Sequence, residues 1–122
     1  MKKILIVEDV ELNLDLLVQL LEDEYLLLSA RDGRSGVKLA RDEKPDLIIM
    51  DMSLPILDGW SAAHEIRTNQ ATKNIPIIAL TAHALEGERQ KALEAGCSAY
   101  LTKPVDERLL SKTIKSLLQV GA

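Results

Sequence analysis

The sequence predicts an α/β domain of the doubly wound type, in which a five-stranded parallel sheet is covered by five helices. Three observations lead to this fold class. Short unbroken apolar runs recur at similar intervals, and the segments between them have the apolar spacing of helices. Runs of this length suit strands that are buried on both faces of a parallel sheet. In addition, polar or charged residues directly follow these runs.

The first half of the chain contains two predicted strands and two predicted helices. Ile4 to Val7 is an apolar run, and the helix after it repeats apolar residues at i, i+3, i+4 and i+7. A second strand, with its apolar run at Leu26 to Leu28 inside Tyr25 to Ala30, follows after a very short turn. The apolar helical positions are Leu14, Leu17, Val18 and Leu21 in the first helix, and Val37 and Ala40 in the second.

The second half of the chain continues this alternation. Its three predicted strands are Leu47 to Met50, Ile75 to Leu80 and Ala99 to Leu101. The fourth helix, roughly Leu85 to Ala95, is largely polar and contains Gly87. The third and fifth helices are predicted from Ala62 with Ile66, and from Leu110, Thr113, Ile114 and Leu117. Because no linker or repeat interrupts the pattern, we expect one domain over residues 1–122, with no output domain.

The composition excludes several classes of function. Hydrophobic residues make up 47% and charged residues 28%, with a formal net charge of -4, so no basic patch favours nucleic acid. No apolar run approaches the roughly 20 residues of a membrane span, and the first run is too short for a secretion signal. Cys97 is the only cysteine, which excludes an intramolecular disulfide. We therefore expect a cytoplasmic protein in a reducing compartment.

Polar side chains follow four of the predicted strands at the edge where ligands bind in open α/β sheets. Alone, each of these residues is more commonly a turn former, a helix cap or a surface lysine. Together, three carboxylates, a hydroxyl and an ammonium converge on one edge. Chance produces this whole set much less often than it produces any one of these residues. They are Glu8 and Asp9 after the first strand, Asp51 after the third, Thr81 after the fourth, and Lys103 in the segment Thr102-Lys103-Pro104 after the fifth.

This combination is suited to a divalent ion and a phosphoryl group. Carboxylates held close together repel, and a bound cation is one common resolution. Oxygen ligands without His or Cys suit Mg²⁺ or Mn²⁺ rather than zinc. An Asp carboxylate such as that of Asp51 can accept a phosphoryl group covalently, with Lys103 and Thr81 supplying positive charge and a hydroxyl.

The chain resembles the receiver domains of bacterial two-component response regulators, of the stand-alone single-domain type. The resemblance covers nearly all 122 residues, and its motifs are only moderately specific one by one but strong in this order and spacing. The resemblance rests on five segments, which are Lys3-Ile-Leu-Ile-Val-Glu-Asp9, Asp46-Leu-Ile-Ile-Met-Asp51, Leu54-Pro-Ile-Leu-Asp-Gly59, Ile78-Ala-Leu-Thr-Ala82 and Tyr100-Leu-Thr-Lys-Pro104. Glu8 stands where Asp is commoner in the family, and Leu54 replaces a frequent Met.

The resemblance implies a flavodoxin-like strand order, 2-1-3-4-5, and a role for each matched residue. Asp51 would be the phosphoacceptor, and Glu8, Asp9, Asp51 and the backbone carbonyl of Ser53 would hold Mg²⁺ or, in its place, Mn²⁺. Thr81, Lys103 and the backbone N–H of Ala82 would contact the phosphoryl group, Tyr100 would be the aromatic switch residue, and Lys103-Pro104 would be a cis peptide bond.

The resemblance also implies how such a chain works. A histidine kinase or a histidine phosphotransfer protein would be the donor. Phosphorylation would change the surface of the fourth helix, fifth strand and fifth helix, for binding to a downstream protein or for onward relay. The chain would be a stoichiometric acceptor that catalyses its own phosphorylation and dephosphorylation, not an enzyme. The sequence names neither the kinase nor the target.

The first predicted helix carries a second apolar stripe, Leu12, Leu16 and Leu20, on nearly the opposite side from its core stripe. We predict that a partner, the helix with the donor histidine, docks on this stripe. Packing of the same residues against the last helix is the equally weighted alternative. We also hypothesise that His83, two residues after Thr81, controls the access of water to the site.

Three alternative functions agree less well with the sequence. A Mg²⁺-dependent phosphohydrolase usually has a second Asp two residues after the nucleophile, where this chain has Ser53, and it needs a cap for which no residues are left. A nucleotide or flavin binder needs a phosphate-cradling loop, but the segment from Glu8 to Asn13 is acidic and has no glycine. A non-phosphorylated interaction module of the same fold is disfavoured by the intact acidic site.

Overall fold

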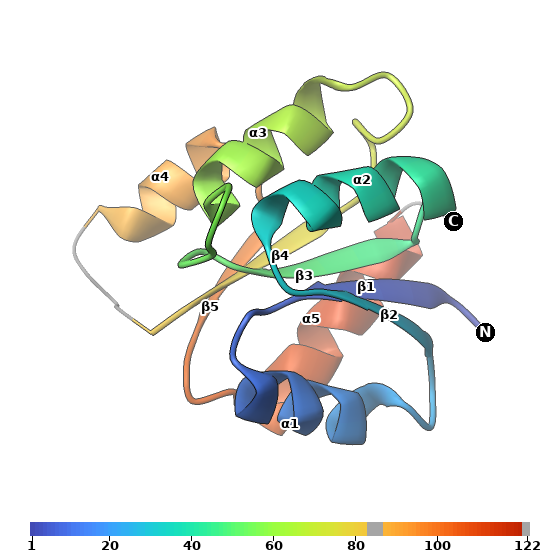
Figure 1. Ribbon diagram of the computed structural model, residues 1–122. Coiled ribbons are helices and arrows are strands. Elements are labelled where there is room, and N and C mark those ends of the chain that lie inside the picture. Colours follow the sequence, from blue (N-terminus) through green and yellow to red (C-terminus); the bar gives the residue numbers. More distant parts are fainter. Residues whose placement is uncertain (83–86, 121–122) are drawn as a thin grey trace.

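Five parallel strands form one sheet in the order β2-β1-β3-β4-β5, and helices cover both of its faces (Figure 1). The structure, a computed structural model, describes residues 1–82 and 87–120. Its elements are β1 (Lys3–Val7), α1 (Glu11–Leu21), β2 (Leu26–Ala30), α2 (Gly33–Glu43), β3 (Leu47–Asp51), α3 (Gly59–Thr68), β4 (Ile77–Thr81), α4 (Glu88–Glu94), β5 (Ala99–Thr102) and α5 (Glu107–Val120). The predicted fold class and strand order are therefore confirmed.

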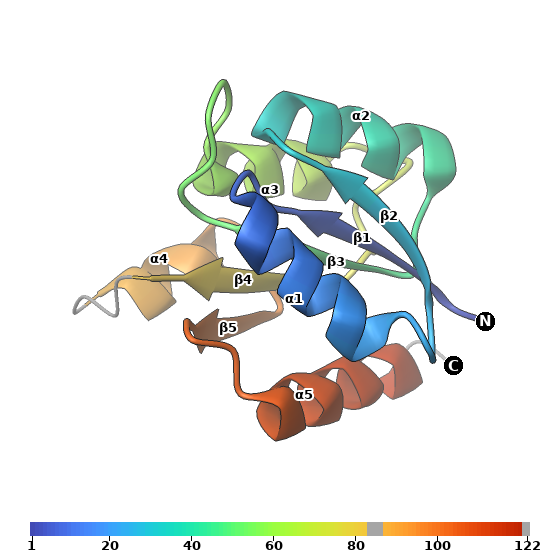
Figure 2. The same cartoon turned by 60° about the horizontal axis from the view of Figure 1, so that its bottom comes forward.

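The two faces of the sheet form two separate apolar cores because neighbouring residues in a strand point to opposite faces. Leu5 and Val7 of β1 lie in the core under α2, α3 and α4. Ile4 and Ile6 of the same strand lie in the core under α1 and α5. The ribbon shows the same division, with α1 and α5 together on one side of the sheet (Figures 1 and 2).

Burial on both faces, predicted for all five strands, holds for the central strands only. Every residue of β3 and β4 is buried, and so is β1 from Ile4 onward. In β2 only Ala30 is buried, and in β5 no residue is fully buried. The prediction was wrong for these two strands because the strand order places them at the edges of the sheet, where each has only one neighbouring strand.

Two predicted boundaries differ from the structure. The fourth strand was predicted from Ile75 but begins at Ile77, because Pro76 has no N–H to donate to a strand ladder. The described part of the fourth helix is Glu88–Glu94, after Gly87 in a left-handed conformation with φ +87°. The start of that prediction, and His83, lie outside the described residues.

Aspartate side chains cap the starts of α2, α3 and α5, and at α5 Asp106 accepts a hydrogen bond from the Leu109 N–H at 3.1 Å. Asp32 accepts a hydrogen bond from the Ser35 N–H at 2.7 Å at the start of α2, and Asp58 accepts one from the Ser61 N–H at 2.8 Å at the start of α3. Such caps satisfy backbone N–H groups that have no partner inside a helix. Among the described residues, no helix combines the length and the apolar character that crossing a bilayer requires.

Candidate functional site

Four neighbouring strands end at one edge of the sheet, and each brings a polar side chain to it. Glu8 and Asp9 follow β1, Asp51 and Thr81 are the last residues of β3 and β4, and Lys103 follows β5. These strands are β1-β3-β4-β5 in spatial order, so residues far apart in sequence become neighbours. The Lys103 backbone N–H donates to the Thr81 carbonyl oxygen at 2.7 Å, which holds the end of β5 against β4.

Glu8, Asp9 and Asp51 form an acidic cluster in which one carboxylate oxygen from each residue lies within 4.8 Å of the others. Glu8 and Asp51 are buried, whereas Asp9 is partly exposed. Carboxylates at this spacing repel one another, and burial makes the repulsion stronger. Because all the donors are oxygen atoms, with no His or Cys among them, the cluster fits a hard divalent cation such as Mg²⁺.

Lys103 supplies positive charge to this cluster. Its Nζ donates to Glu8 Oε1 at 2.7 Å and lies 3.5 Å from Asp51 Oδ1, with only 16% of its side chain exposed. Burial raises the pKa of Glu8, while the hydrogen bonds from Lys103 and from the Val10 N–H oppose this rise, and the nearby charge of Asp51 adds to it. Three carboxylates facing one ammonium leave the site with an excess of negative charge.

Asp51 is held in place by the backbone around it. Its Oδ1 accepts a hydrogen bond from the Ser53 N–H at 3.2 Å. The N–H of the next residue, Met52, donates a hydrogen bond to the Leu80 carbonyl oxygen at 3.0 Å. The Met52 carbonyl oxygen accepts a hydrogen bond from the Gly59 N–H at 3.1 Å. The backbone next to Asp51 is therefore fixed to β4 and to the start of α3. The side chain of Ser53 itself is exposed, at the rim of the site.

Thr81 and Tyr100 are connected to each other and to α4. Tyr100 packs partly on the core under α2, α3 and α4, and its hydroxyl and that of Thr81 form a hydrogen bond. The Tyr100 hydroxyl also donates to Glu88 Oε2 at 3.2 Å. The pKa of Tyr100 is raised, first by burial and then by the hydrogen bond to the Glu88 carboxylate and its charge, against a smaller lowering by Thr81. This arrangement links the acidic site to the first turn of α4.

Glu88 was not singled out in the sequence. The fourth helix is polar along most of its length, so nothing in the pattern distinguished this carboxylate from its neighbours. Two other predicted site positions have simple placements. Ala82 directly follows Thr81 and is exposed, and the peptide bond between Lys103 and Pro104 is cis.

The predicted docking stripe on α1 is exposed only over its first two residues. Leu12 and Leu16 are 78% and 44% exposed, but Leu20 is half-buried and packs against the core under α1 and α5. Each step of four residues advances about 40° around a helix, so a stripe that begins opposite the sheet turns toward the core as it continues. Leu20 is therefore less accessible to a partner than Leu12 and Leu16. Docking of a partner on this stripe stays a prediction.

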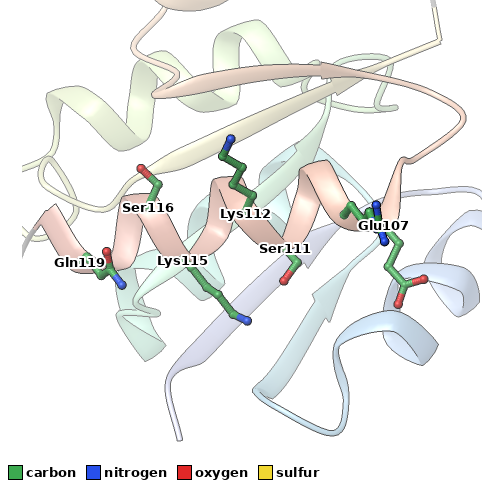
Figure 3. A pocket seen from close by; sticks show the side chains of 7 residues that line it. Glu107, Ser111, Lys112, Lys115, Ser116 and Gln119 are labelled. Carbon is green, nitrogen blue, oxygen red and sulfur yellow. The ribbon is translucent and has the colours of Figure 1, made fainter.

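Hollows of the surface do not by themselves locate the site. A hollow of about 780 Å³ lies along the outer face of α5, and no residue of the acidic cluster lines it (Figure 3). Figure 3 shows Lys112 and Ser116 pointing to one side of the helix and Ser111 and Lys115 to the other. Side chains that diverge from one helix do not surround a ligand. A smaller cavity of about 80 Å³ lies beside Glu8 and Lys103, between α1 and the segment after β5.

Comparison with known proteins places the chain among signalling domains. A family model described as "Response regulator receiver domain" matches residues 4–115. The polar-differentiation response regulator DivK of Brucella anthropi is 38% identical over 118 residues, which are 96% of this chain and 96% of that protein. DivK of Brucella ovis is equally similar, with 38% identity and the same coverage.

Solved structures give the same result. The receiver domain of the sensor histidine kinase PA1611 from Pseudomonas aeruginosa has 38% identity and a TM-score of 0.90, over 97% of this chain and 98% of that one. That structure has a magnesium ion coordinated in its active-site cleft. The chemotaxis protein CheY4 of Vibrio cholerae has 28% identity and a TM-score of 0.89, over 96% of this chain and 98% of that one.

Proposed function

The chain belongs to the family of response regulator receiver domains of two-component systems, and we propose that it accepts a phosphoryl group on Asp51. One observation carries this proposal: a buried carboxylate lies in the acidic cluster with Glu8 and Asp9, and Lys103 Nζ is 3.5 Å from its Oδ1. Such a carboxylate can act as the nucleophile, while the lysine supplies positive charge for the incoming phosphoryl oxygens.

Mg²⁺ is the cofactor that this donor set fits. Glu8, Asp9, Asp51 and the backbone carbonyl of Ser53 would hold it, and the ion in the Pseudomonas aeruginosa receiver domain supports this assignment. When bound, the ion supplies positive charge that neutralises the phosphoryl oxygens. Mn²⁺ accepts the same oxygen donors, and we propose that it can replace Mg²⁺.

The proposed donor is a phosphohistidine of a histidine kinase or a histidine phosphotransfer protein. A carboxylate oxygen of Asp51 forms the new P–O bond, the P–N bond to the imidazole breaks, and the imidazole takes up a proton from solvent. Lys103, the Thr81 hydroxyl and the Ala82 backbone N–H would contact the transferred group. The same residues would assist hydrolysis of the acyl phosphate, so the chain would promote its own phosphorylation and dephosphorylation without turning over a substrate.

The hydrogen bonds of Tyr100 support a switch. A phosphoryl group adds three acceptor oxygens beside Thr81 and would draw its hydroxyl toward them. Thr81 would then leave Tyr100, whose other bond is to Glu88 on α4. The surface of α4, β5 and α5 would change as a result, for binding to a downstream protein or for onward relay. The small apolar contribution of α4, in which only Ala92 is buried, suits an element that moves.

We further propose that the domain acts in the cytoplasm as a response regulator, and its 38% identity to the DivK proteins supports this role. On α1, the exposed residues Leu12 and Leu16 would contact the donor protein. Introducing a negative charge by Leu16→Asp would slow transfer from a protein donor but spare phosphorylation by acetyl phosphate.

Intact-mass measurement after incubation with acetyl phosphate tests the proposal. The wild type should gain the mass of one phosphoryl group in the presence of Mg²⁺ and should gain little after chelation. Asp51→Asn should gain none. Phosphorylation of Asp51→Asn at the wild-type level would show that another residue is the acceptor.

A further inference from the structure

We propose that Ile56 is an apolar recognition residue for the protein that donates the phosphoryl group, an inference that rests on the proposed function of Asp51. Ile56 lies in the loop that joins β3 to α3, shortly after Asp51 and Ser53. It is the residue of this loop with positive φ, and unlike the apolar residues Leu54 and Leu57 of the same loop it is exposed.

The backbone of Ile56 is in the left-handed region, with φ +69°. The Leu57 N–H donates to the Pro55 carbonyl oxygen at 2.7 Å, so Ile56 is the central residue of a γ-turn. Glycine and asparagine adopt this region readily, whereas a β-branched side chain crowds the backbone there. The other non-glycine residue with positive φ in the described chain is Lys44. It ends α2, where this conformation is common.

The interior of the domain gives no reason for an isoleucine at this position. The side chain of Ile56 is 82% exposed, the highest exposure among the large apolar residues described. Its neighbours Leu54 and Leu57 anchor the loop instead, because both pack in the core under α2, α3 and α4. Ile56 therefore combines an unfavourable backbone conformation with an apolar side chain that contributes little to folding.

The loop that carries Ile56 is fixed against α2. The Gly33 N–H donates to the Pro55 carbonyl oxygen at 3.4 Å, and a Cβ at Gly33 would lie 1.7 Å from the Leu57 carbonyl oxygen. Only glycine permits this approach at the start of α2. Figure 2 shows the loop between β3 and α3 projecting beyond the start of α2. Ile56 is thus presented outward from a loop that is held in place.

Other exposed apolar residues flank the acidic site from α1. Val10, Leu12 and Leu16 are 47%, 78% and 44% exposed, and they follow β1 at the same edge of the sheet as Asp51. With Ile56 on the β3 side, the site has apolar side chains on two of its borders. A protein that brings a phosphohistidine to Asp51 would cover both borders and bury these side chains. A small phosphodonor would cover neither.

Two substitutions at Ile56 separate recognition from folding. Ile56→Asn removes the apolar group and suits positive φ, while Ile56→Met keeps an apolar group without the β branch. Both should raise the melting temperature, by roughly 2–5 °C for Ile56→Asn. Transfer from a protein donor should fall roughly tenfold or more in kcat/KM for Ile56→Asn and stay near the wild-type value for Ile56→Met. Leu109→Asn, an exposed apolar residue on α5, should leave transfer unchanged.

The donor in this experiment is the phosphorylated histidine kinase or phosphotransfer domain that loads the wild type fastest in a panel, and acetyl phosphate is the small donor. Acetyl phosphate should load all variants at the wild-type rate. Equal protein transfer to Ile56→Asn and the wild type, an equal loss with acetyl phosphate, or an absence of transfer from every protein donor would overturn the proposal. Failure of acetyl phosphate to load Asp51 in the wild type would instead refute the proposed function itself.

Discussion

Lys103 Nζ lies 2.7 Å from Glu8 Oε1 but 3.5 Å from Asp51 Oδ1, so this lysine is bound more closely to Glu8 than to the proposed acceptor. The short contact with Lys103 lowers the free-energy cost of burying the charged Glu8 side chain. The longer distance to Asp51 leaves that carboxylate without a short ion pair, which would compete with its proposed role as nucleophile. On phosphorylation, the ammonium has only a short distance to move to reach the new oxygens.

Glu8→Gln should separate metal binding from folding. Glutamine can still accept the hydrogen bond from Lys103, so the free energy of unfolding without metal should change by about 1 kcal/mol or less. Loss of one carboxylate from the cluster should weaken Mg²⁺ binding by at least about tenfold. Urea unfolding with and without Mg²⁺ measures both quantities, because saturation at about 100 times the Kd stabilises a protein by about 2.7 kcal/mol. Glu11→Gln, the same change on exposed α1, is the matched control. Equal Mg²⁺ stabilisation of both variants would exclude Glu8 from the metal site.

Glu88→Ala should lower the pKa of Tyr100 toward its ordinary value of 10.0, because the carboxylate that accepts its hydrogen bond disappears. The chain has two tyrosines, so the ultraviolet titration is performed in a Tyr25→Phe background. Since the folded pKa is raised, the neutral phenol contributes stability below pH 10.0, and this contribution is lost as the pH rises through the folded value. An identical titration curve after Glu88→Ala would show that this bond does not form in solution.

Arg67→Met should destabilise the domain by about 2–3 kcal/mol. The half-buried guanidinium donates to the Gly96 carbonyl oxygen at 2.9 and 2.7 Å and to the Ile75 carbonyl oxygen at 2.9 Å, and it also bonds to Lys73. These bonds join the end of α3 to the turn after α4, and methionine leaves the carbonyl oxygens without this donor. Arg89→Met, on the exposed side of α4, should change stability by no more than about 0.5 kcal/mol. Thermal or urea unfolding of both variants gives the comparison, and similar values for the two would contradict the assigned role.

Asp32→Ala should cost about 1 kcal/mol at neutral pH through loss of the helix cap, whereas Asp32→Asn should cost less because its amide oxygen can still accept the hydrogen bond. The hydrogen bond from the Ser35 N–H holds the pKa of Asp32 below its ordinary value of 3.8. The carboxylate therefore contributes stability above pH 3.8, and this contribution is lost as the pH falls through the lowered value. Urea unfolding between neutral and acidic pH should show the advantage of the wild type over Asp32→Asn shrinking in acid. A constant difference would rule out the carboxylate as its source.

Much of the fold could be predicted because the apolar pattern is physically tied to burial. Unbroken runs such as Leu47 to Met50 correspond to strands with helices on both faces, and the leucine spacing of α1 identified its core positions. The site could be located for a related reason: carboxyl ends of parallel strands meet at one edge, so Asp9, Asp51, Thr81 and Lys103 were expected there.

The apolar pattern did not predict burial correctly where residues from other parts of the chain decide which side chains are covered. Leu20 has the periodicity of an outward stripe, yet it is half-buried at the core under α1 and α5. Leu26 to Leu28 reads as a buried strand, yet β2 is at an edge. The bond between the Gly33 N–H and the loop at Pro55, and the bond between Tyr100 and Glu88, depend on contacts that no local spacing encodes.

By itself, the amino-acid sequence determined the class of this domain and the chemical groups available at the end of each strand, because side-chain polarity and spacing are local properties. Only the tertiary structure decided that Lys103 pairs first with Glu8, that Tyr100 joins Thr81 to α4, and that Ile56 stands outside the core. The reason is geometric: distances of a few ångströms between residues far apart in the chain are set by how the strands and helices pack together.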